Sequence, residues 1–336
     1  KEKKMKKLLT TTALIGLVAS SVSSYAETKV TGSIEQTYNA NSVGGTDAKS
    51  GSDGLGQETN LKISSSKELD NGMNLSGGFN SEDGAIDSSS IVLSSGAISF
   101  GVGADFGQHI HSNINPRVDD NPFDAISLSG DDGMNVYQVH DKQHVGLAFK
   151  TDMGTVALNY APGNTSITAS DGSTASAGGS GTEISFKGNL GVDGLTVLLG
   201  QETISADTNG QVTAATAEEV EKVAGFKYGQ GAWAVGYTHR TFDDGTTSAI
   251  ENSIDTVTAI SATYAISDSL SIGYENLTGE FESSALKDEE SDAITVGYNL
   301  GGLGVSVMYV ESDNIAGGNT AQDTQEELQI RTVYKF

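Results

Sequence analysis

The fold of this chain is decided by its last nine residues, Leu328-Gln329-Ile330-Arg331-Thr332-Val333-Tyr334-Lys335-Phe336. Apolar or aromatic side chains occupy most even positions, and polar or charged side chains occupy most odd positions. Because a β-strand places alternate side chains on opposite faces, the pattern predicts a strand with one apolar and one polar face. The strand reaches the final residue, as a closed barrel requires, because the last strand of a barrel pairs with its first.

The beginning of the chain has the pattern of an export signal. Lys6 and Lys7 precede an apolar run from Leu8 to Val18, and small residues follow up to Ala26. This order predicts a secretory signal peptide over 1–26 that is removed, leaving 27–336 as a single domain. The apolar run is too short to span a bilayer as a helix.

Composition excludes several classes of protein. The whole chain has a net charge of −25, and residues 1–26 hold five Lys and one Glu, so 27–336 carries −29. Such a charge argues against nucleic acid as a partner and favours cations. The chain has no Cys, so it has neither disulfides nor Cys-based metal sites. Mean hydropathy is −0.24, and no long apolar stretch after Val22 predicts a membrane-spanning helix.

Period-two alternation recurs along the rest of the chain and predicts about sixteen strands. In the first half we expect strands over 27–39, 56–66, 72–80, 88–94, 97–104, 135–150 and 155–161. In the second half we expect hairpins that join 183–187 to 195–199, 224–228 to 233–237, 260–264 to 270–274, and 294–298 to 305–309. Short Gly, Asn or Asp turns alternate with long polar connections. This alternation is typical of an all-β, transmembrane antiparallel β-barrel with short periplasmic turns and long external loops.

The second face of these strands is too polar for a dry core. It carries Glu35, Asn60, Lys62, Asn74, Ser76, Ser99, Asn159, Glu183, Lys187, Lys227, Thr238, Arg240, Glu275, Asn299 and Arg331. Burying that many charges away from water would cost several kcal/mol each. We therefore expect a water-filled lumen, which a barrel of about sixteen strands is wide enough to hold.

With these features the chain resembles the Gram-negative outer-membrane general diffusion porins, a family of trimeric barrels with sixteen strands. The resemblance rests on the signal-like start, the alternating connections, the strand count and the ending Tyr334-Lys335-Phe336. It implies a homotrimer in outer-membrane lipid that passes small hydrophilic solutes and cations, without catalytic residues or a cofactor. It also implies that Tyr334 and Phe336 act as the assembly signal read by the barrel-assembly machinery.

The resemblance further implies a third external loop that folds into the lumen and narrows it. The matching segment is 105–134, the longest connection expected, and its candidate site residues are Asp105, Arg117, Asp119, Asp120 and Asp124. Porins often set an acidic third loop against basic residues on the opposite wall. The candidate wall cations are Lys62, Lys150, Lys187, Lys227, Arg240 and Arg331, which are scattered and mainly Lys. An acidic constriction with few cations predicts a preference for cations.

Other clusters favour solvated side chains over metal sites. His109 and His111 could bind a transition metal together with Asp105, but we expect them to be solvated loop residues. Hard cations bind clustered carboxylates, so weak Ca²⁺ binding is the most that the acidic pairs predict, at Asp131, Asp132, Asp243 and Asp244.

Three other functions stay open. A substrate-specific porin would vary the same architecture. An outer-membrane enzyme, either a protease or a lipase, would lose hydrolysis when His109, His111 or His239 is changed, although no G-x-S-x-G motif marks a nucleophile. A structural or adhesin barrel would have a plugged lumen.

Overall fold

The computed structural model describes residues 27–44, 53–119, 122–123, 139, 143–162, 180–205, 218–243, 254–283, 285–315 and 324–336. The predicted signal peptide, 1–26, lies outside these residues and stays a prediction. Within the described ranges, no helix has both the length and the apolar character needed to cross a membrane.

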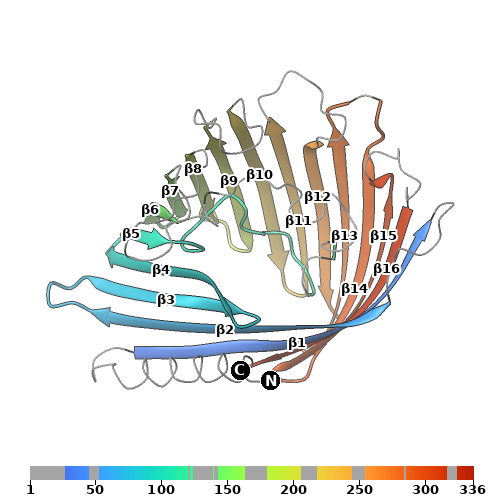
Figure 1. Cartoon of the computed structure of the whole chain (residues 1–336), viewed down its shortest axis with the longest axis horizontal. Helices are drawn as coiled ribbons and strands as arrows, with labels where there is room; N and C mark the ends of the chain where they lie inside the picture. The colour runs from blue at the N-terminus through green and yellow to red at the C-terminus, as the bar shows by residue number, and fades with distance from the viewer. Residues whose placement is uncertain are drawn as a thin grey trace, which may run out of the picture.

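The described residues form sixteen antiparallel strands closed into one barrel (Figure 1). The predicted fold class and strand count are therefore confirmed. The strands are β1 Glu27–Gly44, β2 Gly54–Glu68, β3 Asn74–Glu82, β4 Ala85–Ser95, β5 Ile98–Gly103, β6 His144–Thr151, β7 Gly154–Ala161, β8 Gly181–Gly188, β9 Leu195–Ile204, β10 Glu219–Gln230, β11 Trp233–Asp243, β12 Ile254–Ala265, β13 Leu270–Phe281, β14 Glu289–Asn299, β15 Leu303–Asp313 and β16 Thr324–Lys335.

One predicted strand, 135–150, is shorter than expected. β6 begins only at His144, and the described residues before it, Val139 and Gln143, lie outside any strand. The alternation is irregular around His140, so the sequence did not mark where the preceding connection ends and the strand starts.

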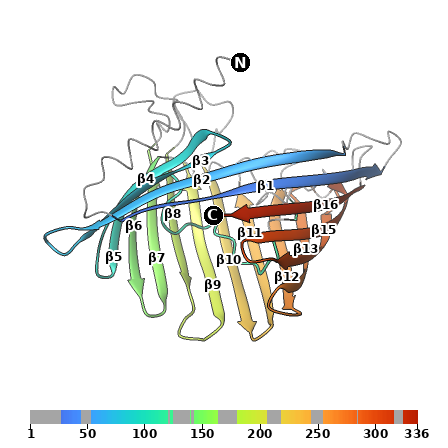
Figure 2. The same ribbon diagram turned by 90° about the horizontal axis from the view of Figure 1, so that it is seen from below.

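The barrel is closed by β1 and β16, which lie side by side in Figure 2. Their register runs from Ser33 opposite Lys335 to Gly44 opposite Thr324. The pairing extends to the final residue, because the backbone N–H groups of Gly32 and Phe336 each donate to the other's carbonyl oxygen at 3.0 Å. Such closure removes the exposed edges that an open sheet would present to lipid.

Connections at the two rims differ as expected. The turns between β6 and β7 (152–153), β8 and β9 (189–194), and β10 and β11 (231–232) are short, and they lie together at the lower edge of Figure 2. We call this end the short-turn rim. At the other rim most connections are long, for example 162–180 and 205–218, but the turn between β3 and β4, 83–84, has only two residues and departs from the expected pattern.

The two faces of the barrel wall have the predicted polarity. In β14, for example, Ile294, Val296 and Tyr298 point outward and are 40–50% exposed, whereas Ala293 and Thr295 point inward and are buried. The outward face is thus apolar around the barrel, as contact with lipid requires.

The interior corrects one expectation, because it is not uniformly wet. An apolar cluster packs inside the barrel towards the long-connection rim, and it holds Phe123, Phe242, Ile254, Val257, Ala259, Leu277, Phe281, Ala293, Met308 and Val310. Period two assigns a residue to a face, but it does not tell which inward residues a folded-in loop will cover.

A close approach at Gly32 supplies a test of barrel closure. A Cβ atom there would lie 2.5 Å from the Asn60 carbonyl oxygen and 2.6 Å from the Phe336 ring. Gly32→Ala therefore forces the closing strands apart and should lower stability by about 1–3 kcal/mol. The temperature at which the folded band disappears in a semi-native gel should fall. Gly304→Ala is the matched control, since its nearest new neighbour is 3.9 Å away, and an equal fall in both variants would contradict the argument.

Candidate functional site: the loop inside the barrel

The segment that follows β5 turns into the barrel and runs along its inner wall (Figure 1). Near its start, the ring of Phe106 stacks on His144 at a centroid distance of 4.3 Å and an interplanar angle of 4°. Near its described end, Asp119 contacts Ser306 of β15 and Arg331 of β16. We call residues 104–119 the inner loop; it confirms that the connection after β5 folds into the lumen.

Glycines on the wall allow the inner loop to lie close to the strands. A Cβ atom on these glycines would come within 2.3–3.0 Å of a loop side chain: Gly200 under Ile110, Gly225 under Ile114, Gly236 under Pro116, and Gly273 and Gly297 under Val118. Glycine in a strand often marks such an approach of another segment. The loop can therefore pack directly against the strand backbone at these glycines.

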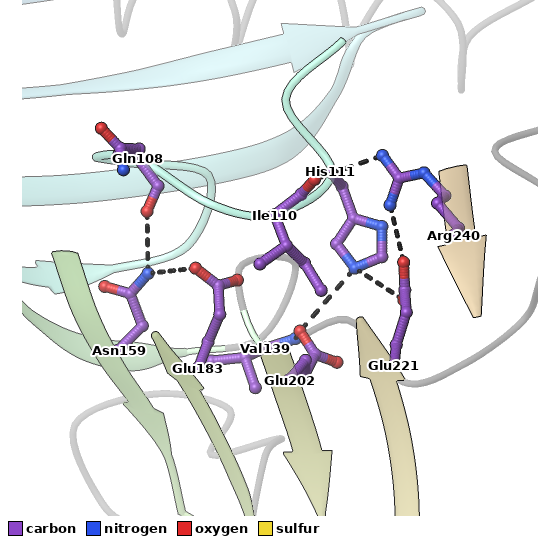
Figure 3. Close-up of polar contacts among 9 residues, drawn as sticks. All are labelled: Gln108, Ile110, His111, Val139, Asn159, Glu183, Glu202, Glu221 and Arg240. Carbon is purple, nitrogen blue, oxygen red and sulfur yellow. Dashed lines mark hydrogen bonds and ion pairs between the residues drawn. The ribbon is translucent and has the colours of Figure 1, made fainter. Parts of the chain in front are cut away.

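Polar contacts fix the first part of the inner loop. The Gln108 side chain donates to the Thr155 carbonyl oxygen at 3.1 Å and contacts the Ser185 hydroxyl at 3.2 Å. The Asn159 amide donates to the Gln108 carbonyl oxygen at 3.0 Å and to Glu183 at 3.1 Å (Figure 3). These bonds give hydrogen-bond partners to the backbone carbonyl and the side chain of Gln108 where the loop lies against the wall.

Beneath the middle of the inner loop lies a row of three glutamates. Glu183, Glu202 and Glu221 are directly opposite one another on β8, β9 and β10. They are only 3%, 0% and 1% exposed. Like charges directly opposite in a sheet are destabilising, so this row requires compensating partners.

Compensation comes from the loop and from the next strand (Figure 3). The His111 imidazole lies 3.3 Å from Glu221 and 3.7 Å from Glu202. Arg240 of β11 pairs with Glu221 at 2.6 Å and also donates to the Ile110 carbonyl oxygen at 3.2 Å. The backbone N–H of Val139 donates to Glu202 at 2.9 Å. Buried carboxylates are tolerated when paired and hydrogen-bonded in this way.

The described end of the inner loop is held by ion pairs. The Arg117 guanidinium donates two hydrogen bonds to the carboxylate of Glu275 on β13, at 2.8 and 2.9 Å. Asp119 pairs with Arg331 at 2.5 Å, and Arg331 also pairs with Glu35 of β1. The loop is thus anchored to the wall from β5 round to β16.

The structure places the predicted site residues as follows. Of the loop residues, Asp105 lies at the start of the inner loop, Arg117 and Asp119 contact the wall, and Asp120 and Asp124 lie outside the described residues. By strand parity, all six wall cations point inward: Lys62, Lys150, Lys187, Lys227, Arg240 and Arg331.

The expected charge pattern, an acidic loop facing a basic wall, needs correction over 105–119. Here the loop contributes a cation, Arg117, to an acidic wall residue, and an acid, Asp119, to a basic one. His111 is also not the solvated residue expected, because it is 6% exposed and lies against two glutamates.

The sequence reasoning missed Glu202 and Glu221. Both have the inward parity of their strands, which is a usable signal, but neither lay in the short apolar stretches used to find the strands.

Metal binding gains no support from the described residues, among which no group of three or more His, Asp or Glu side chains could hold a metal ion. Of the weak Ca²⁺ candidates, Asp243 ends β11, and Asp131, Asp132 and Asp244 lie outside the described residues. Weak Ca²⁺ binding therefore stays a prediction.

The Arg117–Glu275 pair generates a stability prediction. Arg117→Ala leaves the carboxylate of Glu275 buried without its bidentate partner, which typically costs about 3–5 kcal/mol. We expect a lower thermal unfolding midpoint and noisier open-channel current. The double variant Arg117→Ala/Glu275→Gln should lose less stability than the single variant, because it leaves no unpaired charge at position 275. If the double variant is as unstable as the single one, buried charge is not the cause.

Comparison with known proteins agrees with this architecture. A family model described as Gram-negative porin matches residues 10–315. A search of curated proteins found no match.

Solved structures share the fold. OmpT, an outer membrane protein of Vibrio cholerae, has a TM-score of 0.64 at 15% identity, with 94% of this chain and 99% of that chain covered. A triple mutant of a Rhodopseudomonas blastica porin has a TM-score of 0.58 at 13% identity, with 92% and 100% covered. At these identities the likeness shows the fold alone, whereas the family model covers most of the sequence. The chain therefore belongs to the Gram-negative porin family and is a transmembrane β-barrel of the outer membrane.

Proposed function

We propose that this porin is a passive channel for small hydrophilic solutes and ions, assembled as a homotrimer, with a preference for cations. The observation that carries the proposal is the inner loop, whose described residues, 104–119, lie along the wall. Beside its described end, an open hollow of about 440 Å³ extends along β13–β16. Its lining is mixed, with the charged residues Asp119, Asp268, Arg331 and Lys335, several serines, and the apolar residues Val118, Leu270, Val305 and Val333. The charged and hydroxyl groups of this wall suit hydrated solutes, and the width of the passage excludes larger ones.

Cation preference is supported by the acidic excess of the chain, whose net charge is −25. Carboxylates near a narrow passage raise the local concentration of cations. In the inner loop the relevant carboxylate is Asp119, which offsets the charge of Arg331. We propose that the channel selects solutes by their size and by their charge, through the acidic residues of the loop.

Assembly is proposed to depend on the last strand. Tyr334 and Phe336 both face outward, about half exposed, with ring centroids 6.2 Å apart. This placement leaves both rings accessible, in support of their proposed role as a signal for the barrel-assembly machinery.

Arrangement of the histidines does not favour an enzyme. His239 lies on the outward parity of β11 and shares a 2.9 Å hydrogen bond with Thr258. His111 points instead to the buried glutamates inside the barrel. The described part of the chain therefore does not bring these two imidazoles into one catalytic group, and porin family membership agrees.

Planar-bilayer recording tests the proposed function. Protein purified from outer membranes in detergent should insert with stepwise openings, often in threes, and give a cation-sided reversal potential in a KCl gradient. Insertion with a β-type circular dichroism spectrum but without conductance would contradict a channel and favour a structural barrel.

The loop acids supply a more specific prediction. Asp119→Asn, Asp120→Asn and Asp124→Asn combined should shift the reversal potential towards the anion side, because Arg331 keeps its charge while its loop partner becomes neutral. The control combines Asp70→Asn, Asp152→Asn and Asp193→Asn, which lie in short turns and remove the same total charge. Equal reversal potentials in the two variants would exclude the loop acids as the selectivity filter.

A further inference from the structure

Three lysines gather on the inner wall between the inner loop and the short-turn rim. They are Lys150 of β6, Lys187 of β8 and Lys227 of β10, which we call the lysine row. Strand parity places them inside, because Lys187 shares the face of Glu183, and Lys227 shares the face of Glu221. Lys150 likewise shares the face of Gly146, whose added Cβ would meet the ring of Phe106.

Register brings the members of the row together. Thr155 of β7 stands opposite both Lys150 and Lys187. On β9, Leu198 stands opposite Lys187, and the next inward residue, Thr196, stands opposite Lys227. Since neighbouring strands are about 4.8 Å apart, members two strands apart are separated by roughly 10 Å along the wall. Lys187 and Lys227 are close enough to interact electrostatically.

The lysine row differs from the arginines of the same lumen. Arg117, Arg240 and Arg331 each pair with a carboxylate. Among the described residues, by contrast, no member of the lysine row has an ion-pair partner. Lys150 is exposed and the other two are half-buried, so their ammonium groups can reach a solute.

On the strands that carry and flank the row, no described carboxylate faces inward beside it; Asp152 and Asp193 lie beyond it, in the short turns. The row's nearest inward neighbours in register are Ser99, Ala148, Thr155, Ser185, Thr196, Leu198 and Gly236. The glutamates of the same strands lie further from the short-turn rim, buried beneath the inner loop. The fixed charge on the strand residues between the inner loop and the short turns is therefore positive.

We propose that the lysine row is a binding site for small oxyanions that carry two or more negative charges. Lys ammonium groups on flexible stems can converge on one anion, and the threonine hydroxyls between them can donate hydrogen bonds. A multivalent anion also relieves the repulsion among the three cations, whereas chloride relieves less of it. This inference rests on the proposed channel function, since solutes reach the row through the lumen.

The experiment measures block of KCl current by inorganic pyrophosphate, added to each side of the bilayer in turn. We expect block of the wild-type channel, stronger from one side, and a half-blocking concentration at least tenfold higher in Lys150→Gln/Lys187→Gln/Lys227→Gln. Citrate in a second arm separates a general oxyanion site from one that requires phosphate. Equal half-blocking concentrations in the wild type and the triple variant, or no block of the wild type, would overturn the proposal.

Two controls keep the result specific. The corresponding triple Lys→Arg variant keeps the charge and should keep the block. Lys67→Gln/Lys222→Gln/Lys287→Gln removes three exposed lysines that lie outside the row and off the inner wall, and it should also keep the block, so that an equal loss of block there would overturn the assignment to the row. Absence of any current from the wild type would instead refute the proposed channel, and normal current with unaltered block would refute only the lysine row.

Discussion

The structure depends on the pairing of the last strand with the first. In the hydrocarbon region an unpaired backbone N–H or C=O group costs several kcal/mol, so a sheet there must have no edge. Mutual hydrogen bonds between Gly32 and Phe336 extend this pairing to the end of the chain, and Gly32 can approach so closely only because it has no side chain. Once the sheet is closed, every strand has one face in lipid and one face in the lumen, and the charges on the inward face must be accommodated inside the barrel.

The inner loop shows how that accommodation works. Its apolar side chains sit over wall glycines such as Gly200 and Gly236, which makes room for a second layer inside the barrel. That layer then covers glutamates of the wall, and burial forces each of them to find a partner. His111 and Arg117 of the loop and Arg240 of the wall supply the positive side of these contacts. Packing and charge pairing therefore fix the path of the same segment.

Much of the fold could be predicted from the sequence, because period-two alternation is local. The terminal stretch from Leu328, the sixteen strands and the inward parity of residues such as Arg331 follow from it. The contacts between side chains inside the lumen do not follow from this alternation. Glu202 and Glu221 become neighbours only through strand register, and His111 meets them only through a loop path that spans many strands. Non-local contacts of this kind leave no periodic trace, so His111 was expected in solvent.

Because contacts inside the lumen decide which charges are covered, the net charge of the chain can differ in sign from the local charge that a solute meets. Arginine suits buried, bidentate pairing, and Arg117 with Glu275 has that geometry. Lysine carries a compact, strongly hydrated charge, which favours water over a buried pair. The lumen follows this division, because its three described arginines are paired under or beside the inner loop, whereas the lysine row has no ion-pair partner among the described residues. A strongly acidic chain can thus present a basic surface on one side of its constriction, and the sign of the local field follows from which charges the loop covers.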